Sequence, residues 1–244
     1  MIEVQDLRKA FGKVQAVDGV SFMARDGEIT GLLGPNGAGK TTTLRMLYTL
    51  MRPDSGSIRV DGIDAIHDAL AARQHLGVLP DARGVYKRLS ARENIGYFAR
   101  LHGLSGAALR TRVDAMIALL EMQDIAERRS EGFSQGQRVK VALARALVHE
   151  PHNLILDEPG NGLDVMATRA LREFLRRLRG EGRCVLFSSH IMQEIAALCD
   201  RIIVIARGRV IAMGSSDELR TRTGANNLED AFVSLIGSGE GLAA

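Results

Sequence analysis

The stretch Glu28–Thr41 reads EITGLLGPNGAGKT and decides the fold. It begins with a short apolar run, passes through a glycine-rich turn, and continues into Thr41–Leu50, which we expect to form a helix. A short apolar run that ends in glycines is typical of a buried strand. The sequence therefore predicts a strand–turn–helix unit at this point.

The turn itself matches the pattern G-x-x-x-x-G-K-[ST] over Gly34–Thr41. Small residues allow successive backbone N–H groups to curl around phosphate oxygens at the N-terminus of a helix. Lys40 would reach the β- and γ-phosphates of a nucleotide, and the Thr41 hydroxyl would ligate Mg²⁺. The residues expected to bind nucleotide in this segment are Gly34, Pro35, Asn36, Gly37, Ala38, Gly39, Lys40, Thr41 and Thr42.

A second polar group follows the apolar run Asn153–Asp157 (NLILD). Ligands of open α/β sheets bind at the carboxyl ends of the strands, so Asp157 and Glu158 fall where a ligand is expected. Asp157 could hold Mg²⁺ through water, and Glu158 could polarise an attacking water molecule. Between the two motifs, Ser134 and Gln137 form a capping-box pattern at the start of a predicted helix, Gln135–Val148, and such a helix start is also an anion site.

Composition excludes several classes of protein. The chain has 244 residues, of which 45% are hydrophobic and 25% charged, so wholesale disorder is excluded. Its net charge of +3 is spread out, and with 4% aromatic residues and no Trp we expect no nucleic-acid partner. The two cysteines, Cys184 and Cys199, are too few for a disulfide framework or a zinc site. The chain shows no signal sequence and no run long enough to span a membrane, so we expect a cytoplasmic protein.

The remaining pattern alternates strands and helices. We expect strands in the first 35 residues, an edge strand over Ser55–Gly62, a short strand over Leu76–Pro80 and then a helical insert. The later predicted elements are the helix Val165–Leu178, the buried strand Cys184–Ser188, a hairpin over Arg201–Met213 and a short helix over Asn227–Leu235. Buried strands separated by helices indicate a parallel sheet covered on both faces.

Taken together, these motifs resemble the nucleotide-binding subunits of ABC transporters along essentially the whole chain. The resemblance rests on GPNGAGKT, on FSQGQ as a variant of the signature LSGGQ, on LILDEP, on NGLD (Asn161–Asp164) and on SSH, which ends at His190. It implies an α/β fold with a P-loop NTPase core and parallel sheet, an N-terminal antiparallel β subdomain and an inserted α-helical subdomain at about residues 82–150. It also implies a single domain over residues 1–236, with residues 237–244 as a flexible tail.

The same resemblance assigns further residues. Two subunits of this family sandwich two ATP molecules head to tail, so Ser134 and Gly136, with Gln137, would contact the nucleotide of the partner subunit. Asp164 would link the two sites, and His190 would join Glu158 in catalysis by contacting the γ-phosphate. Phe11 matches the aromatic residue on which adenine stacks. ATP and Mg²⁺ are the cofactors that this assignment implies.

Three positions depart from the family pattern. Asp81 stands where a glutamine usually helps to hold Mg²⁺ and the attacking water, and a carboxylate there could also ligate Mg²⁺. The alternative for Asp81 is a residue that caps a solvent-exposed turn. Gln135 replaces the first glycine of the signature, and Gly160 stands where Thr or Ser commonly follows Glu158-Pro159.

Three segments further resemble the exporter subgroup that includes NatA-type sodium-efflux ATPases and drug-efflux relatives: LRKAFGKVQAVDGVSF, GVYKRLSARENI and LEDAFVSL. The expected partners are a second copy or a close paralogue, and an integral membrane permease that recruits the chain to the cytoplasmic face of the membrane. The insert, with Tyr86 and Leu89, is the expected docking region. Two alternatives stay open: a soluble ABC ATPase that acts on ribosomes or DNA, and an ATP-binding module with little hydrolysis.

Overall fold

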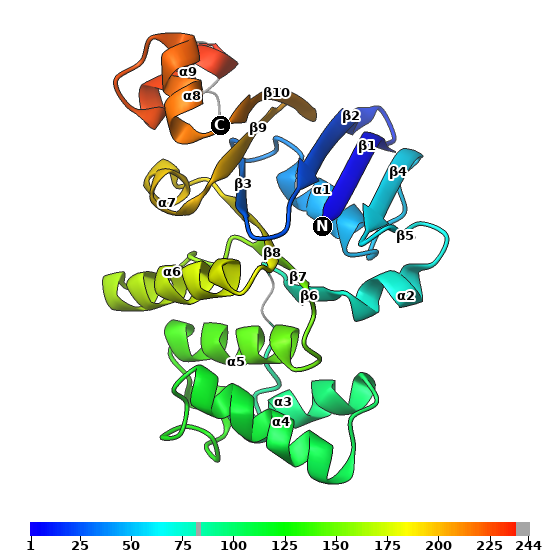
Figure 1. Cartoon of the computed structure of the whole chain (residues 1–244), viewed down its shortest axis with the longest axis vertical. Helices are drawn as coiled ribbons and strands as arrows, with labels where there is room; N and C mark the ends of the chain where they lie inside the picture. Colours follow the sequence, from blue (N-terminus) through cyan, green and yellow to red (C-terminus); the bar gives the residue numbers. More distant parts are fainter. Residues whose placement is uncertain (82–83, 238–244) are drawn as a thin grey trace.

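The computed structural model describes residues 1–81 and 84–237 (Figure 1). Its strands are β1 (Ile2–Phe11), β2 (Val14–Ala24), β3 (Ile29–Leu33), β4 (Ser55–Val60), β5 (Ile63–Asp64), β6 (Leu76–Leu79), β7 (Asn153–Asp157), β8 (Cys184–Ser189), β9 (Arg201–Ala206) and β10 (Arg209–Gly214). Its α-helices are α1 (Lys40–Leu47), α2 (Ala69–Gln74), α3 (Ala91–Leu101), α4 (Gly106–Leu119), α5 (Gln135–Leu147), α6 (Val165–Gly180), α7 (Met192–Leu198), α8 (Ser216–Thr223) and α9 (Leu228–Ile236).

The N-terminal strands form an antiparallel sheet, which in the described residues has the order β2-β1-β4-β5. The prediction of Ser55–Gly62 as an edge strand is wrong, because β4 lies between β1 and β5. Asp61 and Gly62 both adopt positive φ, of 49° and 81°, and this turn folds Ile63 back to pair with Val60. An Asp-Gly turn of this kind matches the twist of a hairpin, so the short fifth strand follows from it.

The second sheet is parallel except at one edge. Its order in the described residues is β10-β9-β3-β8-β7-β6, and β10 pairs antiparallel with β9 as the predicted hairpin. The apolar runs that predicted buried strands form β3, β7 and β8 at the centre, where β7 and β8 are buried at every position. The mixed α/β fold with both sheets, implied by the sequence, is confirmed.

Alternate residues of the parallel strands face two different apolar layers. In β7, Leu154 and Leu156 belong to a cluster with the helices α5 and α6, whereas Ile155 faces a cluster with α1 and the antiparallel sheet. Such two-sided burial is the reason why these strands read as continuous apolar runs rather than as alternating ones. The sheet therefore holds the loops at its carboxyl edge on a rigid, double-sided core.

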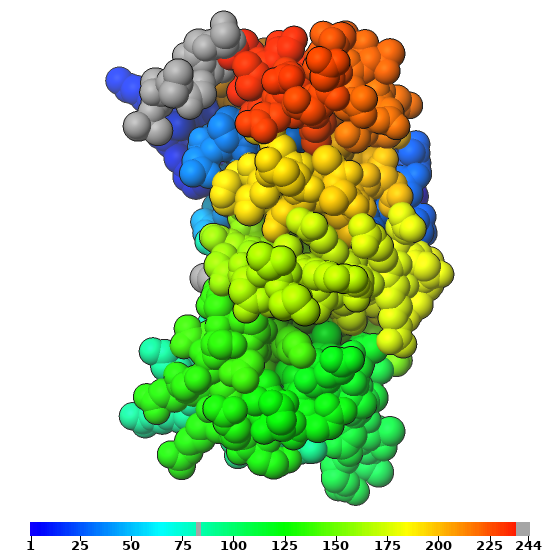
Figure 2. Space-filling model, turned by 90° about the vertical axis from the view of Figure 1, so that its left-hand side faces the viewer, coloured from blue at the N-terminus to red at the C-terminus, as the bar shows by residue number. Residues whose placement is uncertain are grey.

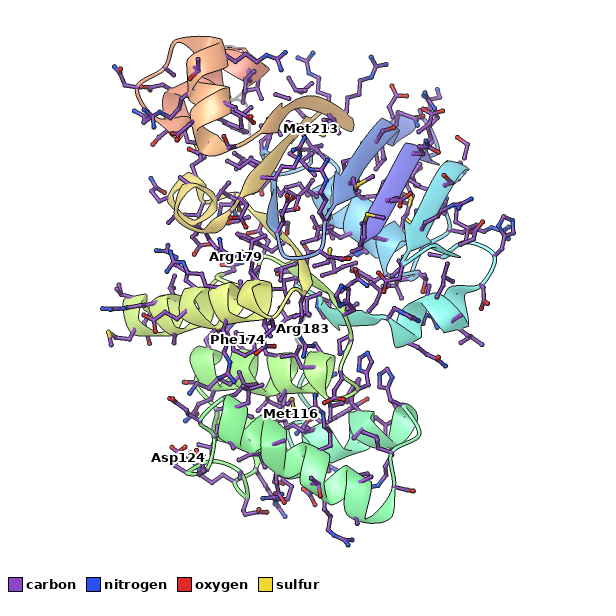
Figure 3. All side chains as sticks on the ribbon, in the orientation of Figure 1. Met116, Asp124, Phe174, Arg179, Arg183 and Met213 are labelled. Atoms are coloured by element: carbon purple, nitrogen blue, oxygen red, sulfur yellow. The ribbon has the colours of Figure 1, made fainter. Side chains whose placement is uncertain are left out.

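Helices α3, α4 and α5 pack together at one end of the molecule, opposite α8 and α9 (Figure 1). They appear in green in Figure 2, next to α6. Met116 of α4 is buried in the same apolar cluster that reaches the parallel sheet, and Phe174 packs against it from α6 (Figure 3). The boundary of the insert at about residues 82–150 stays a prediction. Of the tail predicted at residues 237–244, only Gly237 lies within the described residues.

Three helices in the described part of the chain differ from expectation. Helix α1 ends at Leu47 rather than Leu50, because Tyr48 caps it and Thr49 adopts a positive φ of 61°. Helices α2 and α7 were not predicted, since their six and seven residues are too few to show a helical period. Among the described residues, no helix combines the length and the apolar character needed to cross a membrane.

Candidate functional site

A cavity of about 500 Å³ lies at the ends of β3, β6, β7 and β8. The β1–β2 hairpin contributes Phe11 and Ala16 to its wall. Loops at the carboxyl edge of a parallel sheet can converge in this way because the strands all end on the same side. The cavity is lined by Phe11, Ala16, Asn36, Gly37, Ala38, Gly39, Lys40, Thr41, Thr42, Asp81, Glu158, Asn161 and His190.

Glycines in the loop before α1 are required by close backbone approaches. A Cβ at Gly39 would lie 2.4 Å from the carbonyl oxygen of Ala16, and Gly39 itself has a φ of 100°. A Cβ at Gly34 would lie 2.2 Å from the carbonyl oxygen of Ile205. The glycine pattern thus lets neighbouring strands come close enough to hold the loop in place.

The loop is also hydrogen-bonded to its neighbours through backbone groups. The amide of Gly208, in the β9–β10 turn, donates to the carbonyl of Ala38 at 3.0 Å, and the amide of Asp18 donates to the carbonyl of Gly208 at 2.8 Å. These hydrogen bonds connect the loop before α1 to the β9–β10 turn, and that turn to β2.

Lys40 is only 7% exposed and lies inside the loop that it follows. Its ammonium donates to the carbonyls of Gly34 at 2.7 Å and Pro35 at 3.2 Å, and it lies 3.9 Å from Oε1 of Glu158. Burial lowers the pKa of Lys40, while the charges of Glu158 and Asp157 act in the opposite direction. A buried cation held this way is suited to bind an anion such as a phosphate group.

The buried carboxylate of Asp157 offers a place for a cation. Its Oδ1 accepts from the Ser188 hydroxyl at 2.6 Å and lies 3.5 Å from the Thr41 hydroxyl. Its Oδ2 is buried and has no hydrogen-bond partner among the described residues. Burial raises the pKa of Asp157, an effect that the two hydroxyls oppose and the charges of Asp81 and Glu158 reinforce.

This donor set fits Mg²⁺ bound together with phosphates. Within the described residues, no group of three or more His, Cys, Asp or Glu side chains could hold a metal by itself. Mg²⁺ is usually held by one or two protein oxygens, with substrate phosphates and water as its other ligands. Thr41 and Asp157 would supply the protein ligands, and Asp81 lies near enough to raise the pKa of Asp157.

Glu158 and His190 are brought together by the ends of β7 and β8. His190 Nδ1 lies 2.9 Å from Oε2 of Glu158, and the Glu158 amide donates to the Ser188 hydroxyl at 3.0 Å. Glu158 has a φ of 49°, a left-handed conformation that costs a non-glycine residue about 1–3 kcal/mol. Backbone strain of this kind clusters at functional sites. The two predicted catalytic residues therefore share one corner of the cavity.

Phe11 and Asp81 lie at the wall of the cavity, as expected. Phe11 is 47% exposed, and the Lys9 ammonium lies 5.9 Å from its ring centroid, so part of the residue is accessible to a ligand. Thr42 also lines the cavity, whereas Gly34 and Pro35 contribute through the carbonyls that hold Lys40.

Ser134, Gly136, Gln137 and Asp164 do not line this cavity. Ser134 Oγ accepts from the Gln137 amide at 3.2 Å and Gln137 Oε1 accepts from the Ser134 amide at 3.0 Å, which is the predicted capping box. Asp164 caps α6 by accepting from the Ala167 amide at 2.8 Å. Their expected role at the nucleotide of a partner subunit stays a prediction.

Sequence reasoning missed two residues of the wall. Ala16 contributes a backbone carbonyl, a role that leaves no trace in the type of residue. Asn161 was named only as the first residue of NGLD, and the structure adds that it lines the cavity and that its amide donates to the Glu158 carbonyl at 3.1 Å.

Comparison with known sequences agrees with this geometry. A family model described as "ABC transporter" matches residues 17–161. The chain is 42% identical over 95% of its length, and over 94% of the relative, to the ABC transporter ATP-binding protein NatA of Bacillus subtilis (strain 168). It is 35% identical over 97% of its length to the linearmycin resistance ATP-binding protein LnrL of the same organism, of which it covers 76%. It is 41% identical over 89% of its length to the Nod factor export ATP-binding protein I of Paraburkholderia xenovorans (strain LB400), of which it covers 72%.

Solved structures agree as well. An ATP-binding subunit of an ABC transporter superposes with a TM-score of 0.88 at 30% identity, over 97% of this chain and 100% of the other. A dimeric bacterial ABC transporter cassette, MJ0796, superposes with a TM-score of 0.80 at 26% identity, over 88% of this chain and 98% of the other. The chain therefore belongs to the ABC transporter family, as an ATP-binding subunit that hydrolyses ATP to drive transport.

Proposed function

We propose that this chain powers the export of Na⁺ or a drug-like molecule through a separate membrane permease, and that it dimerises on ATP to do so. The observation that carries the proposal is its similarity, over most of the length of each partner in the comparison, to subunits named for linearmycin resistance and Nod factor export. The permease would hold the chain at the cytoplasmic face of the membrane.

In this proposal the cavity binds ATP in cis. Lys40 and the loop amides would hold the phosphates, and Phe11 would stack on adenine. Thr41 and Asp157 would hold Mg²⁺, whose charge would offset that of the phosphates. Glu158 accepts the proton of the attacking water, and His190 contacts the γ-phosphate while its ring is oriented by Glu158 at 2.9 Å.

The partner copy completes each site. Ser134, Gly136 and Gln137 at the start of α5 would face the γ-phosphate bound by the other subunit, because the first amides of a helix have no acceptor within the helix and can bind an anion. Asp164, at the start of α6, would connect the two sites. The exposed Val165 and Met166 next to it, at 83% and 73%, support a protein contact at this end of α6.

Export is tested in inverted vesicles from cells that co-express this chain with a candidate membrane permease. We expect ATP-dependent accumulation of radioactive Na⁺ or of a fluorescent lipophilic cation, and none with Glu158→Gln. ATP hydrolysis without accumulation of either probe would contradict the proposed cargo. ATP-dependent uptake of a nutrient in right-side-out vesicles would contradict the direction.

We further propose that the permease docks at the aromatic surface around Tyr86. The Tyr86 ring is 47% exposed and packs edge-on against Tyr97 at 5.4 Å, and the Arg145 guanidinium lies 3.7 Å from the Phe98 ring centroid. Exposed aromatic and arginine side chains are enriched in protein interfaces. The backbone of Leu89 is fixed by hydrogen bonds, because its carbonyl accepts from both the amide and the hydroxyl of Ser130 at 2.9 Å.

Co-purification tests this docking. Tyr86→Ser should reduce recovery of the chain with detergent-solubilised permease at least tenfold, since an aromatic anchor contributes about 2 kcal/mol or more. The exposed Lys87→Ser on the same segment is the matched control and should not change recovery. Equal recovery for both variants would exclude Tyr86 as an anchor.

A further inference from the structure

Gly160 is required by space rather than by backbone conformation. Its φ is not among the positive values of the described glycines, so other residues could adopt its backbone. A Cβ at this position, however, would lie 2.5 Å from Oε1 and 2.8 Å from Oε2 of Glu194. The room that a side chain would need at position 160 is therefore filled by a carboxylate from α7.

Glu194 is an unusual residue to find there. It is only 8% exposed, and a buried carboxylate is costly unless it is held by hydrogen bonds. The hydroxyl of Ser189, itself 1% exposed, donates to Oε2 of Glu194 at 3.1 Å. The same hydroxyl accepts from the amide of Ile191 at 3.0 Å.

The residues that make these contacts flank His190 in the sequence. Ser189 precedes it, Ile191 follows it, and the Glu194 amide donates to the Ile191 carbonyl at 3.1 Å. Two of these bonds therefore join the turn that presents His190 to α7. Before His190 it is the side-chain bond from Ser189 to Glu194, and after His190 it is the backbone bond from Glu194 to Ile191. Nothing in the ABC motif pattern required Glu194, and 34 positions separate it from Gly160.

The turn that presents Glu158 is fastened separately. Ser188 accepts from the Glu158 amide and donates to Asp157, which holds the start of that turn against β8. Its far side, at Gly160, rests on the Glu194 carboxylate. Glu194 therefore lies between the two turns whose side chains meet at 2.9 Å between His190 Nδ1 and Glu158 Oε2.

We propose that Glu194 is a positioning residue for ATP hydrolysis, which sets the distance between His190 and Glu158 by spacing their two turns, and that Gly160 makes room for it. The proposal rests on the roles proposed above for Glu158 and His190. Glu194 does not line the nucleotide cavity and acts through the turns alone.

Four variants of the purified chain test the contact. Glu194→Ala removes the spacer and Gly160→Ala displaces it, and each should lower kcat for ATP roughly ten- to a hundredfold with little change in KM, because small misplacements at a reacting centre have effects of that size. Glu194→Gln keeps an acceptor for the Ser189 hydroxyl and should retain most of the activity. Combining Gly160→Ala with Glu194→Ala should cost no more than either change alone, since both disturb one contact.

Two controls match these changes. Gln193→Ala alters an exposed neighbour on α7, and Gly180→Ala adds a Cβ where no atom lies within 4 Å. Side-chain NMR of His190 in the nucleotide-free chain supplies a readout of position. Its ring signals should shift in Glu194→Ala and Gly160→Ala, and they should stay in place in both controls.

The outcomes separate the two proposals. Unchanged kcat in Glu194→Ala, or a fall in kcat with unmoved His190 ring signals, would overturn the positioning role while leaving Glu158 and His190 in place. Unchanged kcat in His190→Ala would overturn the proposed role of His190 itself, and the role of Glu194 with it, without any change at position 194.

Discussion

Burial and charge act against each other at Asp157, which lies behind the cavity wall next to Thr41 and Glu158. Its carboxylate is buried with one oxygen unpartnered, and burial raises its pKa above the ordinary value near 3.8. A group whose folded-state pKa is raised stabilises the fold below its unfolded pKa, and that contribution is lost as the pH rises through the folded pKa.

Asp157→Asn should therefore stabilise the nucleotide-free protein at neutral pH. We expect its melting temperature to exceed that of the wild type at pH 7.5, and the difference to shrink as the pH falls through the folded pKa and then below about 3.9, the unfolded pKa, where the carboxyl becomes protonated in both states. Thermal denaturation across that pH range measures it. An equal difference at all pH values would show that charge burial is not the cause.

Asp81 tests whether the cavity carries a second acidic ligand. If its carboxylate ligates Mg²⁺, ATP without metal should bind more weakly to the wild type than to Asp81→Gln, and Mg²⁺ should increase affinity more in the wild type. Calorimetric titration of ATP with and without Mg²⁺ measures both effects. The same Mg²⁺ dependence in the two proteins would mean that Asp81 only caps its turn.

Among the helices, α5 carries a cap with two separable roles. Ser134→Ala should lower the free energy of unfolding by about 1 kcal/mol, because it removes the acceptor for the Gln137 amide. Ser134→Asp restores an acceptor but places a negative charge where the partner's phosphate is expected, so it should recover stability and still prevent ATP-dependent dimerisation.

Ser90→Ala is the control for that comparison. Ser90 and Glu93 form the same capping box at α3, away from the nucleotide cavity, so this variant should lose similar stability and keep ATP-dependent dimerisation. Denaturant unfolding and size-exclusion chromatography give the two readouts. Normal dimerisation of Ser134→Asp would contradict a role for Ser134 at the partner's nucleotide.

The elements also show what a sequence can reveal. Glycines, Lys40 and the acidic pair at the end of β7 follow local chemical rules, so the phosphate loop, Asp157 and Glu158 could be found from their spacing. Helix α7 and strand β5 are too short to show a period, and the edge position assigned to β4 failed for that reason. The contact of Gly160 with Glu194 depends on tertiary packing across the site, which no local pattern encodes.

For the assembled protein, the decisive expectation is the ATP-bound dimer. Glu158→Gln keeps the shape of the side chain but cannot accept a proton, so ATP should bind and remain unhydrolysed. Size-exclusion chromatography of this variant with ATP and Mg²⁺ should show a dimer, whereas ADP should leave a monomer. A monomer with ATP at micromolar protein would count against the head-to-tail arrangement.

The backbone bridge from Asp18 through Gly208 to Ala38 bears on the thermodynamics of nucleotide capture. A phosphate-binding segment that is already hydrogen-bonded to the β9–β10 turn, and through that turn to β2, has less conformational entropy to lose when a ligand arrives. The affinity for the triphosphate then depends more on electrostatic attraction and on the desolvation of the phosphates than on the cost of ordering the loop. It also means that loosening the β9–β10 hairpin, far from the chemistry in sequence, would weaken capture without altering any group that touches the nucleotide.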